Sequence, residues 1–396
     1  MKTRNLFIGA TLALIASAAL SAHAQTYAGR PAWTISNKKL KVVVLPGGGH
    51  IASMTLTGGK NANVNPLWLP PWQGIDPQNW KPSDKRFGAA PGAPLLSGIL
   101  GHNICVDFFG GPSPAETKAG LPVHGEAPTM EWKPVRKTAN SITYKTNLPK
   151  AQMDVSRTIT LGGDSVMWIT ETVKNNTAFD RPFGWQQHPT FGPPFLKEGE
   201  TFFDIGGKES MVFPQEFSKG ERLKRGATFE WPTGVDKAGN EVDMRAWPVG
   251  NSSSDFTTTK ISPENEWGWF TVVNVKKNLL CGYVWKRRDY PWCAIWEENK
   301  FRDGAPWNKK AVTRGIEFGT TPWAYSRREA ATQGSLFKTP TYRWISAGAS
   351  QTIGYGAFVV NVPAGATGVK SVTVNGNNVS IELEGVDRTL TLKAKR

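Results

Sequence analysis

The sequence predicts an all-β fold, a large antiparallel β-sandwich of two or more packed sheets. Apolar residues recur with a period of two wherever a period is visible, which is the pattern of half-buried strands. Gly and Pro number 41 and 28 of 396 residues, more than the average protein holds, so turns are frequent. No stretch of about twelve residues carries the apolar stripe of an amphipathic helix.

The clearest strands form a meander in the middle of the chain. Residues 153–161 alternate between apolar and polar side chains, with Arg157 as the exception, and a Gly-Gly-Asp turn leads into residues 166–173. Near the C-terminus, Asn375-Gly376 separates two β-rich runs, which predicts a hairpin with a tight turn. Further strands are expected at 41–45, 270–275, 279–285, 292–296 and 356–362.

The cysteines allow two interpretations. Residues 279–285 and 292–296 resemble two arms of a hairpin, and symmetric pairing would bring Cys281 opposite Cys293. A disulfide between them would suit an oxidising compartment, and two buried free thiols are the alternative. Cys105 has no evident partner, and the spacing of the three cysteines is unlike that of a metal site.

Residues 61–127 differ from the rest of the chain because Pro, Gly and Trp dominate there. This composition predicts long surface loops, and ordered loops on a rigid β scaffold commonly carry binding sites. No internal repeat is visible. We expect residues 25–396 to form one domain.

The first 24 residues have the pattern of a cleaved secretory signal. Lys2 and Arg4 precede an apolar run at 6–20, and Ala22-His23-Ala24 ends the segment. The apolar run is shorter than the roughly 20 residues that a membrane-spanning helix needs. The sequence therefore predicts a periplasmic or secreted protein without a membrane anchor.

The charge balance is basic. Removing Lys2 and Arg4 with the leader lowers the formal net charge from +15 to +13. The basic residues are scattered and no nucleic-acid motif is present, so a nucleic-acid partner is not expected. An acidic substrate remains open, beside a generally basic solvated surface.

Two of the four histidines outside the leader stand in compact segments punctuated by Gly and Pro. These are His124 in 121–126 and His188 in 184–192, whereas His50 and His102 have no such context. Glu317 is flanked by Ile and Phe in a strand-like run, where a buried carboxylate would need a partner.

Taken in order, these segments resemble those of the aldose 1-epimerases, or galactose mutarotases. The resemblance covers about three-quarters of the chain, and it implies a mutarotase-like supersandwich that binds a small sugar or an oligosaccharide. The segments that carry it are Leu121–Glu126, Asn175-Asn176-Thr177 through Gln187-His188-Pro189-Thr190-Phe191, Trp231-Pro232-Thr233-Gly234 with Asp243-Met244-Arg245, and Gly315-Ile316-Glu317.

The resemblance also implies roles for individual residues. Glu317 would take the proton from the C1 hydroxyl, and His188 would protonate the ring oxygen. His124 would hold and polarise the same region of the sugar, and Asp243 would contact sugar hydroxyls. Acid/base chemistry of this kind requires no cofactor and no metal.

Departures from the family pattern concern the substrate more than the fold. Gln187 stands where Asn is usual, Gly192-Pro193-Pro194 replaces Asn-Leu, and Phe318-Gly319 follows the glutamate. The family's substrate-binding arginine has no obvious counterpart. A non-catalytic carbohydrate-binding protein, or another sugar enzyme such as a lyase, is therefore an alternative on the same scaffold.

The chain also holds seventeen tryptophans. Flat aromatic faces pack against the C–H faces of sugars, although Trp is also a good core residue of a large sandwich. We expect most of them in the core and a few in the cleft, with Trp185 and Trp296 as the best candidates for sugar contacts.

Overall fold

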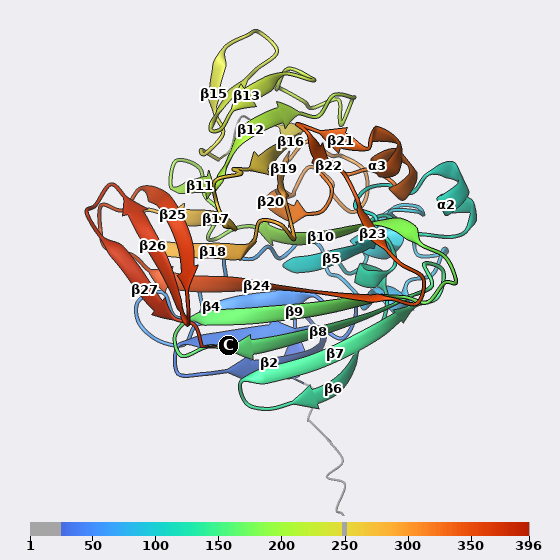
Figure 1. The fold of residues 1–396 in the computed structure, drawn as a ribbon, viewed down its shortest axis with the longest axis horizontal. Coiled ribbons are helices and arrows are strands. Elements are labelled where there is room, and N and C mark those ends of the chain that lie inside the picture. The colour runs from blue at the N-terminus through green and yellow to red at the C-terminus, as the bar shows by residue number, and fades with distance from the viewer. Residues whose placement is uncertain (1–24, 248–251, 396) are drawn as a thin grey trace, which may run out of the picture.

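The computed structural model describes residues 25–247 and 252–395, so the predicted signal at residues 1–24 lies outside the described residues. Two large antiparallel sheets dominate (Figure 1). The larger has twelve strands among the described residues. In spatial order they are β1 (Gln25–Tyr27), β2 (Arg30–Ser36), β3 (Leu40–Val44), β4 (Ile51–Leu56), β5 (His102–Asp107), β10 (Arg181–Phe191), β20 (Val312–Gly319), β19 (Trp292–Asn299), β16 (Ser253–Ile261), β12 (Gly207–Val212) and β13 (Thr228–Glu230), with β23 (Arg343–Ile345) paired to β10.

The second sheet has eight strands, and Figure 1 shows most of them side by side across the lower half of the molecule. Its order is β11 (Thr201–Ile205), β17 (Trp267–Asn274), β18 (Leu279–Lys286), β24 (Ser350–Asn361), β9 (Val166–Asn175), β8 (Met153–Leu161), β7 (Ser141–Leu148) and β6 (Lys133–Lys137). The predicted all-β sandwich of packed antiparallel sheets is thus confirmed.

The main core lies between the two sheets. Burial alternates residue by residue along β8, as the sequence predicted, because one face of the strand meets the core. Arg157 continues this alternation and is fully buried. Its charge is paired within the core, since its Nε lies 2.7 Å from Oε1 of Glu171 on β9. Buried side chains of β4, β5, β10 and β20 meet those of β7, β8, β18 and β24 in one cluster.

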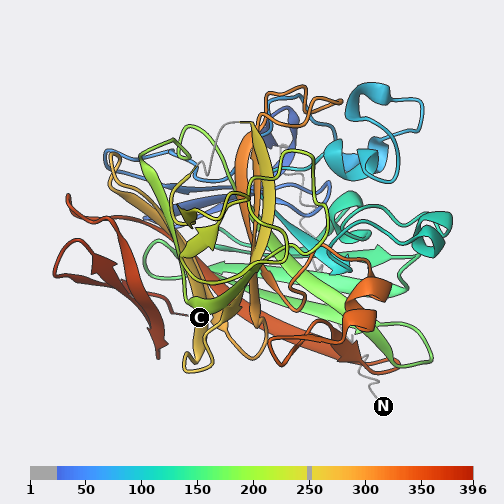
Figure 2. The ribbon, with the colours of Figure 1, turned by 90° about the horizontal axis from the view of Figure 1, so that it is seen from above.

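Short sheets complete the molecule. The predicted Asn-Gly hairpin is present in a three-stranded sheet, which packs on Trp168 and Trp269 of the eight-stranded sheet. Figure 2 shows this sheet, in red, at the opposite end of the molecule from α2. The strands of this sheet are β25 (Gly368–Asn375), β26 (Asn378–Glu384) and β27 (Thr389–Lys393). There are also two sheets of two strands each among the described residues. One pairs β14 (Thr233–Val235) with β15 (Glu241–Asp243), and the other pairs β21 (Ser335–Leu336) with β22 (Thr339–Pro340).

Helices are short. The α-helices are α1 (Ala93–Leu96), α2 (Pro114–Lys118) and α3 (Arg327–Gln333), and the 3-10 helices are η1 (Pro77–Asn79), η2 (Lys85–Phe87) and η3 (Ala127–Thr129). In the part of the chain that the structure describes, no helix has both the length and the apolar character needed to span a bilayer.

One local prediction is wrong, and of the two interpretations of the cysteines the buried free thiols are correct. Strands β18 and β19 do not form a hairpin, because β18 pairs with β17 and β24 while β19 pairs with β16 and β20 in the other sheet. Cys281 and Cys293 are accordingly free and buried, so the disulfide is not formed. The segment 61–127 is mostly irregular, as expected, but it contains β5, a strand buried on both faces.

Candidate active site

Strand pairing brings three predicted site residues together on the outer face of the larger sheet. In the pairing of β10 with β20, Gln187 lies opposite Phe318 and Thr190 opposite Gly315, so His188 falls across from Glu317. On the other side of β20, Trp296 of β19 lies opposite Gly315. The outer face is not solvated here, because the loops around α1 and β5 cover it with apolar side chains.

His188 and Glu317 form a buried pair. The Nε2 atom of His188 lies 2.7 Å from Oε1 of Glu317, and both side chains are almost fully buried. Gly315 makes room for them, since a Cβ atom at this position would lie 2.7 Å from Oε1 of Glu317 and 3.3 Å from Cε1 of His188. An imidazole and a carboxylate in direct contact can serve as acid and base at adjacent atoms of one substrate.

The other ring nitrogen of His188 is also engaged. Its Nδ1 atom lies 2.9 Å from the hydroxyl oxygen of Thr190, two residues along the same strand face. This contact fixes the orientation of the ring and keeps Nε2 directed at Glu317.

His124 reaches the pair from the loop after α2. Its backbone φ is +67°, and its N–H donates to the carbonyl of Gly110 at 2.9 Å. The next residue, Gly125, also has a positive φ, and a Cβ atom there would collide with the carbonyl of Val106. The His-Gly dipeptide thus lets the loop approach β5 closely enough to place the His124 ring 5.0 Å from the ring of His188.

The environment keeps His124 uncharged. Burial is the main cause that lowers its pKa well below the usual value, and the charges of His188 and Arg302 lower it further. Its Nδ1 atom has no hydrogen-bond partner among the described residues. A neutral imidazole in this position can donate or accept one hydrogen bond from a substrate oxygen.

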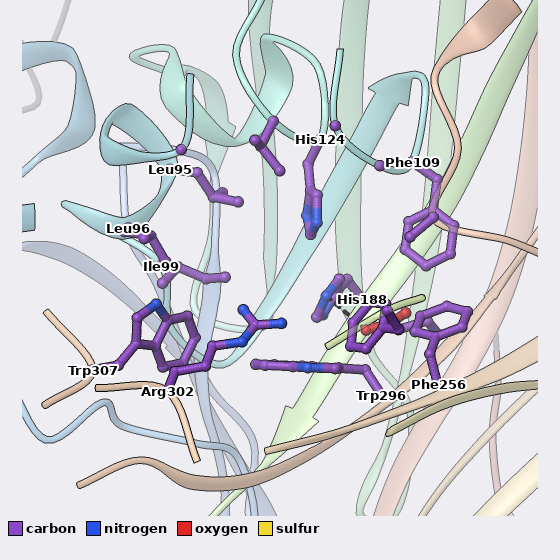
Figure 3. A pocket seen from close by; sticks show the side chains of 17 residues that line it. Leu95, Leu96, Ile99, Phe109, His124, His188, Phe256, Trp296, Arg302 and Trp307 are labelled. Atoms are coloured by element: carbon purple, nitrogen blue, oxygen red, sulfur yellow. Dashed lines mark ion pairs between the residues drawn. The ribbon is translucent and has the colours of Figure 1, made fainter. Parts of the chain in front are cut away.

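These groups line a cavity of about 280 Å³. Figure 3 shows the rings of His124 and His188 and the guanidinium of Arg302 directed toward the same space, with the Trp296 ring along one side. The remaining walls are largely apolar, and Leu95, Leu96, Ile99, Phe109, Val123, Phe217, Phe256 and Trp307 supply most of them. The volume approaches the lower end of the range for small-molecule sites.

Glu317 lacks ordinary hydrogen-bond donors. His188 comes close, yet no described residue donates a well-aligned hydrogen bond to either carboxylate oxygen. Burying a hydrogen-bond acceptor without a donor lowers the stability of the folded protein. A hydroxyl group of a bound molecule would supply the missing donor.

Two predicted site residues lie elsewhere. Trp185 stands three residues before His188 on β10, so it points to the opposite face of the sheet, where its Nε1 donates to Glu171 at 2.9 Å. Asp243 is exposed at the end of β15, and its carboxylate accepts from the backbone N–H of Arg245 at 2.9 Å. Neither residue lines the cavity, so this geometry gives no support for sugar contacts from them.

Sequence reasoning missed Arg302 and most of the apolar wall. Arg302 lies in the connection between β19 and β20, outside every recognised segment. The one available indication was the concentration of Trp in the loops, because Trp68 and Trp72 pack against Trp307, which lines the cavity.

Within residues 25–247 and 252–395, no group of three or more His, Cys, Asp and Glu side chains is placed to hold a metal ion.

No family model and no curated protein matches the sequence. Solved structures do. A candidate aldose 1-epimerase from Klebsiella pneumoniae superposes with a TM-score of 0.60 at 16% identity, over 84% of this chain and 80% of that one. The chain has the galactose mutarotase-like fold.

Further structures agree on the fold at similarly low identity. A candidate aldose 1-epimerase from Escherichia coli K12 gives a TM-score of 0.55 at 15% identity, over 84% of this chain and 99% of that one. A galactose mutarotase related enzyme from Lactobacillus acidophilus gives 0.53 at 16% identity, over 84% and 99%. Identities this low establish the fold alone. The activity has to be inferred from the residues of the candidate site.

Proposed function

We propose that this protein is an exported aldose 1-epimerase-type enzyme that interconverts the α and β anomers of a reducing sugar. The observation that carries the proposal is the contact of His188 with Glu317, at 2.7 Å, inside one small cavity that His124 also lines. The fold shared with proteins described as candidate aldose 1-epimerases supports it.

The arrangement suits the two proton transfers of mutarotation. The carboxylate of Glu317 accepts the proton of the C1 hydroxyl while His188 donates a proton to the ring oxygen, and the C1–O5 bond breaks. Both oxygens are bonded to C1, so an acid and a base lying side by side can reach them. Rotation about C1–C2 turns the aldehyde over, and the ring closes with the two roles reversed.

His124 and Trp296 would position the sugar. The neutral imidazole of His124 offers a hydrogen bond near the ring oxygen, and Trp296 offers an aromatic face to the C–H groups of the sugar. The indole Nε1 of Trp296 has no hydrogen-bond partner among the described residues, so it is available as a donor.

We also propose that the protein is exported from the cytoplasm. The basic start, short apolar run and Ala-x-Ala ending of the first 24 residues support export. Fractionation of the producing cells checks it: the chain should appear outside the cytoplasm with Gln25 at its N-terminus.

Measurement of the approach to anomeric equilibrium tests the function. Freshly dissolved aldoses and uronic acids would be followed by polarimetry or NMR with and without the protein. We expect at least one sugar to equilibrate faster than its spontaneous rate, in proportion to protein concentration. Binding of sugars with no rate increase for any of them would instead identify a carbohydrate-binding protein.

A further inference from the structure

Arg302 occupies a wall of the cavity that the proton-transfer mechanism does not use. Its guanidinium carbon lies 5.0 Å from the ring centre of Trp307 and 5.6 Å from that of Trp296. Figure 3 shows the guanidinium extending from between these rings toward His124 and His188. The ring centre of Phe217 lies 5.7 Å from the same carbon. Packing against three aromatic rings limits the freedom of the side chain and presents its charge in a defined position.

Among the described residues, the guanidinium of Arg302 contacts a carboxylate only through its Nε atom. Its Nε atom lies 3.2 Å from Oε2 of the buried Glu298. The other oxygen of Glu298 accepts from the backbone N–H groups of Phe301 and Arg302, at 2.8 and 3.0 Å, which fixes the loop. No described residue accepts a hydrogen bond from the two terminal Nη groups, and about 32% of the Arg302 side chain is exposed.

An arginine whose two Nη groups have no acceptor within the protein is suited to binding an anion. The two Nη groups form a planar fork that matches the oxygens of a carboxylate or phosphate group. The charge already acts within the cavity, since Arg302 is one of the causes that lower the pKa of His124.

The rest of the cavity offers a neutral sugar few partners. Of its 17 lining residues, those with ionisable side chains are His124, His188, Arg302 and Glu317, and the indole N–H of Trp296 is a further donor. His124, His188 and Glu317 are assigned to C1 and the ring oxygen, which leaves Arg302 and the Trp296 N–H for recognising the remainder of the sugar. Of these two groups, Arg302 carries the charge. The basic charge of the chain, +13 once Lys2 and Arg4 of the leader are removed from the total of +15, also favours the approach of an anionic ligand.

We propose that the preferred ligand is a reducing sugar that carries a carboxylate or phosphate group, and that Arg302 pairs with this group. The substrate class rests on the proposed function, while the binding preference stands on the cavity alone. Because Arg302 and the His188–Glu317 pair line the same small cavity, the anionic group and the reacting carbon belong to one sugar unit.

The test compares three sugars with the same ring: glucose, glucuronic acid and glucose 6-phosphate. Their dissociation constants would be measured by calorimetry for the unmodified full-length protein and for Arg302→Gln, Arg302→Lys and Arg136→Gln. Arg136 is exposed on β6 of the other sheet, so its substitution removes one positive charge far from the cavity. Thermal unfolding shows whether each variant is folded.

We expect the unmodified protein to bind at least one of the two anionic sugars more tightly than glucose. Arg302→Gln should reduce this selectivity by about 10- to 100-fold, the range of a charge-assisted hydrogen bond. Arg302→Lys should restore part of the selectivity, and Arg136→Gln should leave it unchanged. Comparison of glucuronic acid with glucose 6-phosphate identifies the anionic group.

Three results would overturn the proposal: equal affinity for the anionic sugars and glucose, selectivity that survives Arg302→Gln, or an equal loss in Arg136→Gln. Failure here is distinct from failure of the proposed function. Selective binding without any faster anomer exchange would reject the catalytic function and keep the anion site, whereas fast exchange of glucose without selectivity would do the reverse.

Discussion

Thr190 determines how His188 is presented to the cavity. The hydroxyl of Thr190 lies 2.9 Å from Nδ1 of His188, and strand geometry places both side chains on the same face. If Nε2 is to exchange a proton with a sugar, Nδ1 needs a partner that holds the ring in place. Thr190 is thus a positioning residue that acts through His188.

Thr190→Val tests this role, because valine keeps the shape and removes the hydroxyl. We expect the rate of anomer exchange to fall by up to about tenfold, the value of one hydrogen bond, with a shifted pH profile and nearly unchanged sugar affinity. Thr143→Val is the matched control, since Thr143 pairs with Thr158 at 2.9 Å on the other sheet. An unaltered rate and pH profile in Thr190→Val would rule out the positioning role.

Individual residues were predictable from the sequence to different degrees. His124, His188 and Glu317 stood in recognisable segments, and the structure places them around one cavity. Trp185 is close to His188 in the sequence, but strand alternation turns its side chain into the main core. Arg302 could not be found, because its position depends on the path of the loop between β19 and β20.

Among single strands, β20 contributes the candidate base, Glu317, with a glycine two residues before it on the same face. Gly315 and Glu317 point to the cavity, while Ile316 and Phe318 belong to the main core. The missing side chain at 315 leaves space above the strand for the carboxylate and the His188 ring.

Gly315→Ala should disturb this arrangement. The added Cβ would stand 2.7 Å from Oε1 of Glu317, so the carboxylate must move away from its place beside His188. A misplacement of about 1 Å can cost about 10²-fold in rate, and we expect a loss of that size in an anomer-exchange assay. The thermal midpoint should change little, because the flexible carboxylate can yield.

Gly354→Ala provides the control, as its Cβ would meet its nearest atom, the carbonyl of Ile169, at an ordinary 3.7 Å on the other sheet. Gly315→Ala with the full rate would show that the position of Glu317 is not critical.

Strands were predictable where burial alternates, and also where β-branched and aromatic residues dominate, as in β17, β18 and β19, which are buried on both faces. Strand β8 alternates along its whole length, so its pattern was visible in the sequence. Strand β5 is buried on both faces by the sheet core and the covering loops, so its sequence shows no alternation that would distinguish it from the loops around it. The connection between β18 and β19 resembles a hairpin turn, yet it crosses between sheets, which local sequence does not encode.

At the scale of the whole molecule, three buried histidines couple stability to pH. Burial is the main cause that lowers the pKa of His50, His102 and His124 well below the usual value. In the unfolded chain each would protonate near about pH 6.5. Below that pH the unfolded state binds more protons, so stability that is fully present above about 6.5 is lost as the pH falls.

We therefore expect the free energy of unfolding to decrease between pH 7.5 and 5.5, by up to about 1.4 kcal/mol per pH unit for each histidine below pH 6.5. Asp204 opposes this in part, because burial raises its pKa to about 6 and its folded form takes up a proton below that pH. Denaturant titration at several pH values measures the slope.

His50→Leu should remove one of the three contributions, since neither ring nitrogen of His50 has a hydrogen-bond partner among the described residues. A stability that stays flat down to pH 5.5, or a slope unchanged in this variant, would contradict the coupling.

We propose that Glu317 is the base of the anomer exchange, and the substitution Glu317→Gln tests this role. Glutamine keeps the volume and an acceptor oxygen, so folding and sugar affinity should stay within a few-fold of the unmodified protein. It cannot take the C1 hydroxyl proton, so the rate of anomer exchange, measured by NMR at saturating sugar, should fall by about 10²–10⁴-fold. An unchanged rate in a folded Glu317→Gln protein would show that another group is the base.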